Sequence, residues 1–163
     1  MTKTPLLITG ASGLVGSKFI KDWSGIYDFE NLDRLDPIEP VDILNLAQVL
    51  HKFQNSASKF VIHMAAFTDV SKAWEQKGDQ NGAAYQINVV GTQNIITACQ
   101  KTDKHLIHIS TAYVFDGAKE GLYTEDDRPR AIEWYGQTKL EAEKLIQESE
   151  INWTILRIDQ PFR

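Results

Sequence analysis

A tyrosine and a lysine, Tyr135 and Lys139, stand four residues apart in the last third of the sequence. In a helix, this spacing places both side chains on one face. A lysine ammonium beside a phenol favours the phenolate and lowers the pKa of the tyrosine. Such a tyrosine can pass a proton to or from a carbinol oxygen. The spacing alone is common, so the interpretation depends on the rest of the chain.

A serine and a threonine, Ser110 and Thr111, follow an apolar run over 106–109 that predicts a strand. Ligands of open α/β sheets bind at the carboxyl ends of the strands. We therefore expect the Thr111 hydroxyl to reach the same cleft as Tyr135 and to hold a substrate oxygen. The alternative is that Thr111 satisfies a local backbone group at the end of the strand.

Three glycines follow the first apolar run, between a predicted strand over 6–9 and a predicted helix. This context makes a glycine triplet indicative of dinucleotide binding. Gly10 would permit the tight turn, Gly13 would let the backbone approach a pyrophosphate, and Gly16 would let the helix pack closely. The helix N-terminus offers N–H groups and partial positive charge to the pyrophosphate. A turn without a ligand is the alternative. The cofactor contacts expected here are Gly10, Ser12, Gly13, Leu14, Val15 and Gly16.

An acid and a base, Asp33 and Arg34, stand together at the end of the second predicted strand. The Asp33 carboxylate could accept hydrogen bonds from the adenosine ribose and would repel a 2′-phosphate, which favours NAD. Arg34 could pair with that phosphate and weaken the preference. A solvent-exposed acid is the alternative for Asp33.

The composition excludes several classes of protein. The 163 residues carry a formal net charge of -5, which disfavours a nucleic-acid partner. The single cysteine, Cys99, excludes an internal disulfide and fits a reducing compartment. The first apolar run is too short for a signal peptide or a membrane span. We therefore expect a cytoplasmic protein without a membrane partner.

Predicted strands and helices alternate along the chain, which favours an α/β fold with a parallel sheet and right-handed crossovers. Two connections, over 65–82 and 112–133, separate the later elements. The predicted strands are 6–9, 27–32, 41–44, 60–64, 106–109 and 153–158. The predicted helices are 14–24, 45–53, 83–100 and 134–148.

Several further residues are interpreted as structural. His63, His105 and His108 do not form a metal pattern, and we predict no metal site. His63 and His108 fall in predicted strands and are expected in the core or sheet. Cys99 follows apolar residues of a predicted helix and is also expected in the core. Asp69 is interpreted as a capping or solvating loop residue.

Five segments resemble, in order, those of extended short-chain dehydrogenases/reductases of the NAD-dependent epimerase/dehydratase superfamily. Two of them, Ala-Ala-Phe-Thr-Asp-Val and Tyr-Val-Phe-Asp-Gly, look most like dTDP-4-dehydrorhamnose reductases and their nucleotide-sugar relatives. The segments are 9–16, 65–70, Asn88 with 91–94, 110–117 and 135–139.

The resemblance implies one NAD(P)-binding domain over 1–163, a Rossmann-type doubly wound parallel sheet with helices on both faces. It also implies roles for individual residues. Thr111, Tyr135 and Lys139 would form the catalytic set, with Lys139 also reaching the nicotinamide ribose. Asn88 would support the lysine through water, unless it is an ordinary helix-surface amide. Asp42 and Ile43 would flank the adenine, and Ala65 and Ala66 would line the cofactor.

The implied activity is reduction of a nucleotide-activated 4-keto-sugar with NAD(H) or NADP(H), with NAD favoured. Epimerases and dehydratases of the superfamily use the same cofactor and tyrosine and are the nearest alternatives. Ala112 stands where the rhamnose-type reductases usually have an acid, which leaves the exact sugar open.

Family members continue beyond the point where this sequence ends, with a last strand and a smaller substrate domain. The chain therefore resembles a truncated member. A non-catalytic, cofactor-binding module is the second hypothesis, as in the regulatory subunits of methionine adenosyltransferase. The missing strand would leave an open sheet edge, which a second copy of the chain or another partner would cover.

Overall fold

Five parallel strands form one sheet in the computed structural model, which describes residues 2–159. Their order across the sheet is β2-β1-β3-β4-β5. The predicted strands at these five places are confirmed, with ends shifted by at most two residues. The strands are β1 Thr4–Thr9, β2 Tyr27–Leu32, β3 Phe60–His63, β4 His105–Thr111 and β5 Trp153–Ile158.

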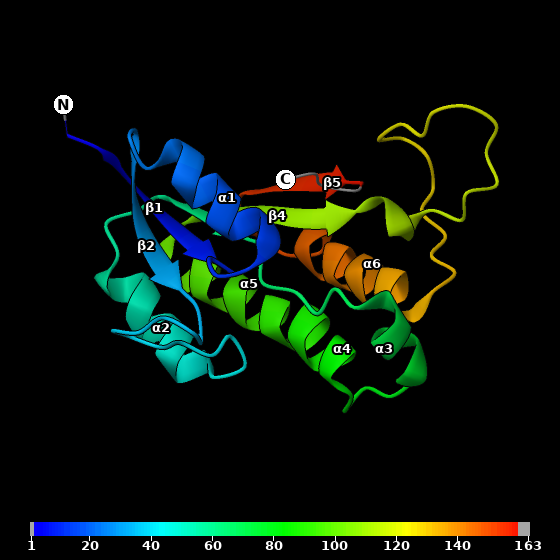
Figure 1. Cartoon of the computed structure of the whole chain (residues 1–163), viewed down its shortest axis with the longest axis horizontal. Helices are drawn as coiled ribbons and strands as arrows, with labels where there is room; N and C mark the ends of the chain where they lie inside the picture. Colours follow the sequence, from blue (N-terminus) through cyan, green and yellow to red (C-terminus); the bar gives the residue numbers. More distant parts are fainter. Residues whose placement is uncertain (1, 160–163) are drawn as a thin grey trace.

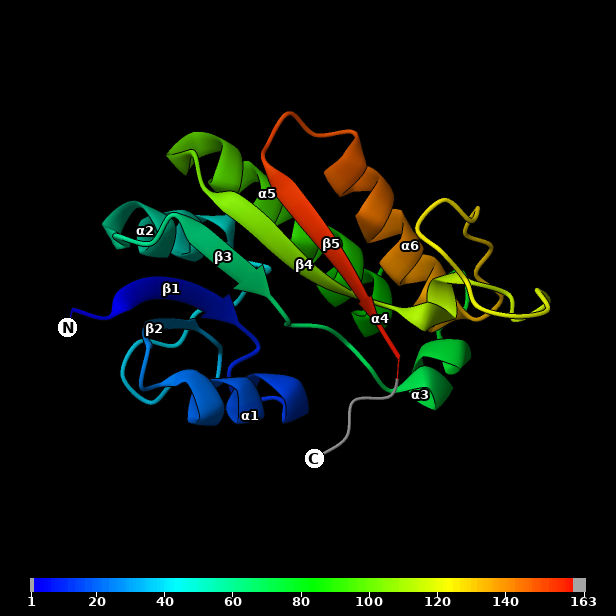
Figure 2. The ribbon, with the colours of Figure 1, turned by 90° about the horizontal axis from the view of Figure 1, so that it is seen from above.

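Helices cover both faces of the sheet, as predicted. Figure 1 shows α1 on one side of the strands and α2, α5 and α6 on the other, and Figure 2 shows the same layers from above. Within residues 2–159, no helix has the length and apolarity needed to cross a bilayer. The longer helices are α1 Leu14–Trp23, α2 Leu46–Asn55, α5 Gly91–Thr102 and α6 Trp134–Gln147. The shorter ones are α3 Val70–Glu75, α4 Ala83–Tyr85, the π-helical η1 Gln86–Val90 and the 3₁₀ turn η2 Ala112–Val114.

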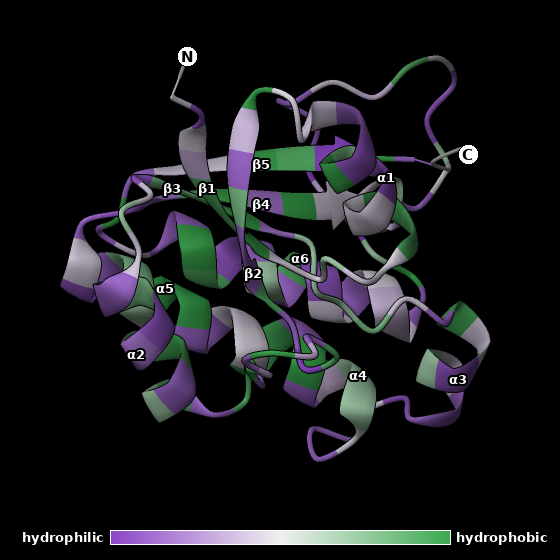
Figure 3. Cartoon of the chain, turned by 60° about the vertical axis from the view of Figure 1, so that its left-hand side comes forward, coloured by the Kyte–Doolittle hydropathy of each residue, from purple (hydrophilic) through white to green (hydrophobic). Residues whose placement is uncertain are grey.

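Two apolar cores follow from the alternation of side chains along each strand. In β1, Leu7 packs into the larger core beneath α2, α5 and α6, whereas Leu6 and Ile8 pack into the smaller core against α1. Figure 3 shows the apolar residues concentrated in the strands and in α5. Cys99 lies in the larger core, as predicted, and burial raises the pKa of its thiol to about 12.

The chain reverses direction across the sheet between β1 and β3. From β1 it passes through α1 to β2 on one side, and it then crosses back through α2 to β3 on the other. Ile8 pairs with Ile62 and Thr9 with His63, so the carboxyl ends of β1 and β3 lie side by side. Such a reversal point is where open α/β sheets bind ligands.

The predicted strand over 41–44 is wrong. The backbone groups there are satisfied locally: Val41 N–H donates to Asp33 O at 3.1 Å, and Leu44 N–H donates to the Asp42 carboxylate at 2.9 Å. The Asp42 N–H donates to the side chain of Gln48 at 3.0 Å. The alternating apolar residues that suggested a strand do mark buried positions, because Val41 and Ile43 lie in the larger core.

The predicted connection over 65–82 contains a short helix, α3, which the sequence reading missed. Asp69 caps it by accepting from Lys72 N–H at 3.0 Å, so its interpretation as a capping residue is confirmed. The predicted helix over 83–100 is present as α4, η1 and α5 in direct succession. The segment in its middle is π-helical. Such wide turns are rare in proteins, and those that occur are often found at functional sites.

Gly16 lets α1 pack directly against the turn after β1. A Cβ at Gly16 would lie 2.2 Å from Gly10 O. We expect Gly16→Ala to lower the free energy of unfolding by about 1–3 kcal/mol, because backbone must move to admit the methyl group. A Cβ at Gly25 meets nothing within 4 Å, so Gly25→Ala should stay within about 1 kcal/mol of wild type. Urea unfolding measures both, and equal losses would contradict the packing argument.

Candidate functional site

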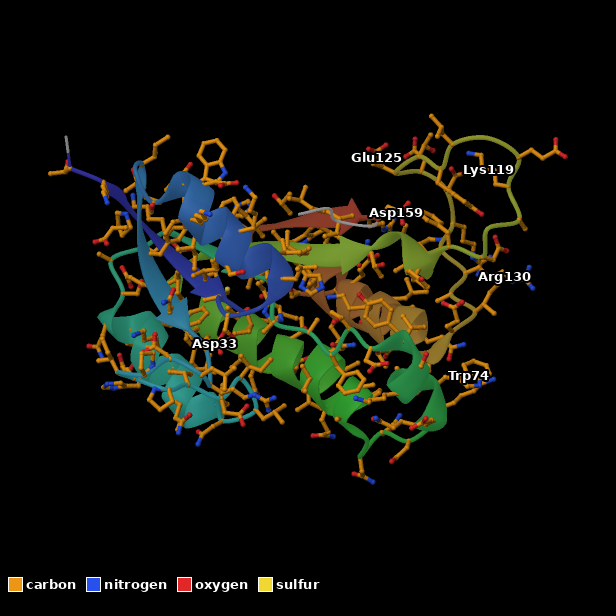
Figure 4. All side chains as sticks on the ribbon, viewed as in Figure 1. Asp33, Trp74, Lys119, Glu125, Arg130 and Asp159 are labelled. Atoms are coloured by element: carbon orange, nitrogen blue, oxygen red, sulfur yellow. The ribbon has the colours of Figure 1, made fainter. Side chains whose placement is uncertain are left out.

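A cleft of about 570 Å³ opens at the carboxyl ends of the strands. It brings together residues that the sequence analysis assigned to the cofactor and to catalysis. Figure 4 shows Asp33 near the end of β2 and Asp159 beyond the end of β5, and both line this cleft. The predicted residues among its lining are Gly10, Ser12, Gly13, Leu14, Val15, Gly16, Asp33, Arg34, Asp42, Ile43, Ala65, Ala66, Thr111 and Tyr135.

The turn after β1 presents backbone rather than side chains to the cleft. Gly10 has a φ of +70°, which favours glycine, and a Cβ there would lie 2.6 Å from Ala65 N. Both the backbone conformation and the close contact therefore require a glycine at this position. Gly13 precedes α1, and no side chain caps the helix. The first N–H groups of α1 and its positive dipole end are therefore open to an anion. This arrangement can hold a pyrophosphate.

Asp33 joins the end of β2 to this turn. Its carboxylate accepts from Ser12 N–H at 2.9 Å, from the Ser12 hydroxyl at 2.7 Å and from Leu35 N–H at 2.9 Å. Burial by itself raises the pKa of Asp33, but the hydrogen bonds from Ser12 and Leu35 outweigh it and the pKa is lowered. The side chain is thus an ionised part of the turn, with Arg34 beside it in the cleft.

Thr111 and Tyr135 meet across the cleft from two elements. Thr111 ends β4 and Tyr135 lies in the first turn of α6, and both side chains are largely buried. Burial raises the pKa of Tyr135, opposed in part by a hydrogen bond with Thr111. The prediction that the pKa of Tyr135 is lowered is therefore wrong, because desolvation is the larger effect. The phenol remains a proton donor at neutral pH.

Lys139 lies one turn further along α6, buried beneath the cleft and not among its lining residues. Its Nζ donates to Ile109 O at 2.8 Å and lies 2.9 Å from His108 Nε2. Burial lowers the pKa of Lys139 to about 7, and the nearby Glu143 opposes this shift. The contacts with β4 replace the phenol contact that the sequence spacing suggested.

Asn88 stands in the π-helical segment and is fully buried. Its side-chain oxygen accepts from Phe67 N–H at 2.8 Å. Its amide group donates to Phe67 O at 3.2 Å and to the Thr138 hydroxyl at 2.9 Å. Asn88 therefore links the segment after β3 to the residue before Lys139, and its support of the lysine through water stays a prediction.

The sequence analysis missed residues that shape the same site. Tyr113 lines the cleft, with its ring edge-on to Tyr135 at 5.7 Å between centroids. A Cβ at Gly136 would lie 2.2 Å from Tyr113 O, so α6 approaches η2 only because this residue is a glycine. The glycine directly after Tyr135 was the available signal. Ile158 and Asp159 also line the cleft, at the end of β5.

The interpretation of His63 and His108 as core residues is confirmed, since both are buried. His63 is bonded at both ring nitrogens, to the hydroxyls of Thr9 at 2.7 Å and Thr92 at 3.0 Å. The His63 and His108 rings lie 5.2 Å apart. A layer of polar groups thus lies under the cleft, between the sheet and the helices.

The sequence matches the family described as RmlD substrate binding domain over residues 4–162. It is 34% identical to dTDP-4-dehydrorhamnose reductase from Aggregatibacter actinomycetemcomitans, a match covering 96% of this chain and 51% of that protein. The crystal structure of dTDP-4-dehydrorhamnose reductase from Bacillus anthracis in complex with NADP has a TM-score of 0.86 and 31% identity, over 97% of this chain and 54% of that one.

A relative that is not named as a reductase is comparably similar. Methionine adenosyltransferase 2 subunit beta from Rattus norvegicus is 33% identical over 94% of this chain and 46% of its own length. The chain thus spans about half the length of the curated relatives that it matches.

The buried histidines predict a loss of stability in acid. Burial lowers the pKa of His63 from 6.5 to about 3 and holds that of His108 well below its usual value. The unfolded chain takes up these protons near pH 6.5 and the folded chain does not. Stability is therefore fully present above pH 6.5 and falls below it, by about 2 kcal/mol at about pH 5 for His63, and His108 adds to the loss in the same direction.

Urea unfolding at about pH 7 and about pH 5 measures this loss. His63→Gln should reduce the pH dependence, because one of the two protonations is removed. His51, which is exposed on α2, provides the control, and His51→Gln should keep the wild-type pH dependence. Equal stability of the wild type at the two pH values would contradict the prediction.

Proposed function

Because the chain belongs to the RmlD substrate binding domain family, we propose that it is the dinucleotide-binding part of a reductase acting on a nucleotide-activated 4-keto-sugar. One observation carries the proposal. The open turn at the start of α1 and the Thr111–Tyr135 pair line the same cleft. A pyrophosphate on the turn would direct the rest of a dinucleotide toward the tyrosine.

The cleft suits a nicotinamide dinucleotide, because it combines N–H groups for phosphates with apolar walls for rings. We expect Asp42 and Ile43 to flank the adenine and Ala65 and Ala66 to line the cofactor, and all four residues line the cleft. The Bacillus anthracis reductase was crystallised with NADP. In this chain the ionised Asp33 would repel a 2′-phosphate, so NAD(H) is favoured, with Arg34 as the opposing group.

The proposed chemistry is a reduction with coupled proton transfer. A bound dihydronicotinamide, the reduced form of the cofactor, would supply hydride to the carbonyl carbon. Tyr135 donates its phenolic proton to the carbonyl oxygen. Its raised pKa keeps the phenol protonated at neutral pH. The Thr111 hydroxyl holds the same oxygen. The substrate would depend on the remaining half of the reductase for its orientation, because a water-filled cleft positions a sugar poorly.

A second candidate function is a non-catalytic module that binds a dinucleotide and a partner protein. The similarity to methionine adenosyltransferase 2 subunit beta favours it. An edge strand can pair with another chain, and β5 is the last strand of the sheet within residues 2–159. Leu156 in this strand is 46% exposed.

Tyr135→Phe separates the two candidates. For the reductase, assayed with its remaining half present, we expect oxidation of NADH with dTDP-4-dehydrorhamnose to fall at least about 100-fold, because general acid catalysis is lost. The affinity for NADH, measured by fluorescence titration, should stay within about threefold. Tyr27→Phe, on the α1 side of the sheet, is the control and should leave turnover unchanged. Binding of NADH without any turnover that depends on Tyr135 would favour the module.

Arg34 tests the choice between the two cofactors. We expect the wild type to bind NADH more tightly than NADPH. Arg34→Ala should weaken NADPH about tenfold further, by removing the cation available to the 2′-phosphate, and leave NADH nearly unchanged. Arg128, exposed in the 115–133 loop, provides the control variant Arg128→Ala. Equal weakening of both cofactors by Arg34→Ala would contradict this assignment.

A further inference from the structure

We propose that His108 is a positioning residue that fixes Lys139 beneath the cleft, an inference that rests on the proposed function. The two side chains come from the two elements that carry the catalytic pair. His108 lies in β4, three residues before Thr111, and Lys139 lies in α6, four residues after Tyr135. Their contact therefore joins the strand and the helix that hold Thr111 and Tyr135 at the cleft.

The contact consists of two hydrogen-bonding partners on one strand. Lys139 Nζ lies 2.9 Å from His108 Nε2 and 2.8 Å from Ile109 O. Ile109 itself lines the cleft, so the amine sits directly behind the cleft wall. Both His108 and Lys139 are at most 2% exposed. The lysine is thereby fixed at the level of the residues that would face a nicotinamide and its ribose.

The proposal requires one tautomer of His108. A protonated lysine can only donate, so with Lys139 charged Nε2 carries the lone pair and the ring proton lies on Nδ1. Burial, Lys139 and His63 together keep the pKa of His108 well below its usual value, which agrees with a neutral ring. Among the described residues, Nδ1 is buried without a partner. An Nδ1–H group that is buried without an acceptor costs free energy. His108 carries this cost while its Nε2 contacts Lys139.

The other titratable side chains around Lys139 are already engaged. Glu143, one turn further along α6, forms a two-point ion pair with Arg157 of β5, with distances of 3.0 and 2.8 Å. His63 of β3 is bonded to two hydroxyls. In the described part of the chain, His108 is thus the side chain that accepts from the amine. Because burial brings the pKa of Lys139 to about 7, loss of this acceptor would change its charge at neutral pH.

Two substitutions at His108 distinguish a side chain that accepts a hydrogen bond from Lys139 from one that only fills space in the core. His108→Gln supplies a side-chain oxygen that can accept from Lys139 in place of Nε2, whereas His108→Leu leaves no acceptor. We expect His108→Leu to lower the proton affinity of Lys139 about tenfold or more, because an acceptor for the ammonium is lost. His108→Gln should stay within about threefold of wild type. His105→Gln is the control on the same strand, since His105 bonds to Thr154 at 2.9 Å.

The titration of Lys139 is followed by NMR at its ¹³Cε and ¹⁵Nζ nuclei, without any cofactor. The ¹⁵N shifts of His108 in the wild type report its tautomer. The proposal is supported by an Nδ1–H tautomer and a lowered Lys139 midpoint in His108→Leu. It is overturned by an Nε2–H tautomer, or by a Lys139 midpoint that His108→Leu leaves unchanged. If the leucine variant does not fold, the tautomer and the glutamine variant still decide.

Kinetics then link the contact to function. In His108→Leu, assayed with the remaining half of the reductase present, we expect kcat for NADH oxidation with dTDP-4-dehydrorhamnose to fall about tenfold, with its pH profile displaced in the same direction as the Lys139 midpoint. His108→Gln should restore both. An unchanged pH profile with an altered Lys139 midpoint would overturn the positioning role. Failure of the wild type to bind NADH would instead overturn the proposed function, while the Lys139 titration would still show whether His108 holds the amine.

Discussion

The backbone of the turn after β1 lies against the end of β3 with no side chain between them, and the rest of the site depends on this contact. Thr9 reinforces it, because its hydroxyl accepts from Met64 N–H at 3.1 Å and from Ala65 N–H at 3.0 Å. The turn then directs the uncapped start of α1 into the cleft and brings Ser12 to Asp33. A side chain at Gly10 would separate the two strand ends, and the cleft would lose the wall that this turn forms.

Much of this arrangement could be predicted because it depends on local sequence. Glycines between a strand and a helix specify one kind of turn, and Tyr135 with Lys139 specifies one face of a helix. The strand over 41–44 was predicted wrongly because Asp42 bonds to the backbone two residues further on, and periodicity does not register such a local turn. The burial of Val41 and Ile43 was nevertheless encoded in the same pattern.

The electrostatics of the site could not be predicted in the same way. The spacing of Tyr135 and Lys139 suggested that the amine lowers the pKa of the phenol. In the fold, the amine is bonded to His108 and Ile109, and burial dominates the pKa of Tyr135. Which acceptor a buried lysine finds depends on the register between α6 and β4, residues about thirty apart in the sequence. Such a distance between partners leaves no local signature in either segment.

The π-helical turn at residues 86–90 has a consequence for the phase of the long helix around it. An α-helix advances about 100° per residue, so one surplus residue in a wide turn offsets everything before it against everything after it. Tyr85 precedes the offset and stacks on Trp134 at 6.3 Å, whereas Thr92 follows it and reaches His63 at 3.0 Å. An uninterrupted helix of the same sequence would rotate one of these contacts away from its partner. The π-helical turn therefore lets one continuous helical segment pack against two differently oriented surfaces. One surface is formed by α6 and the other by the sheet.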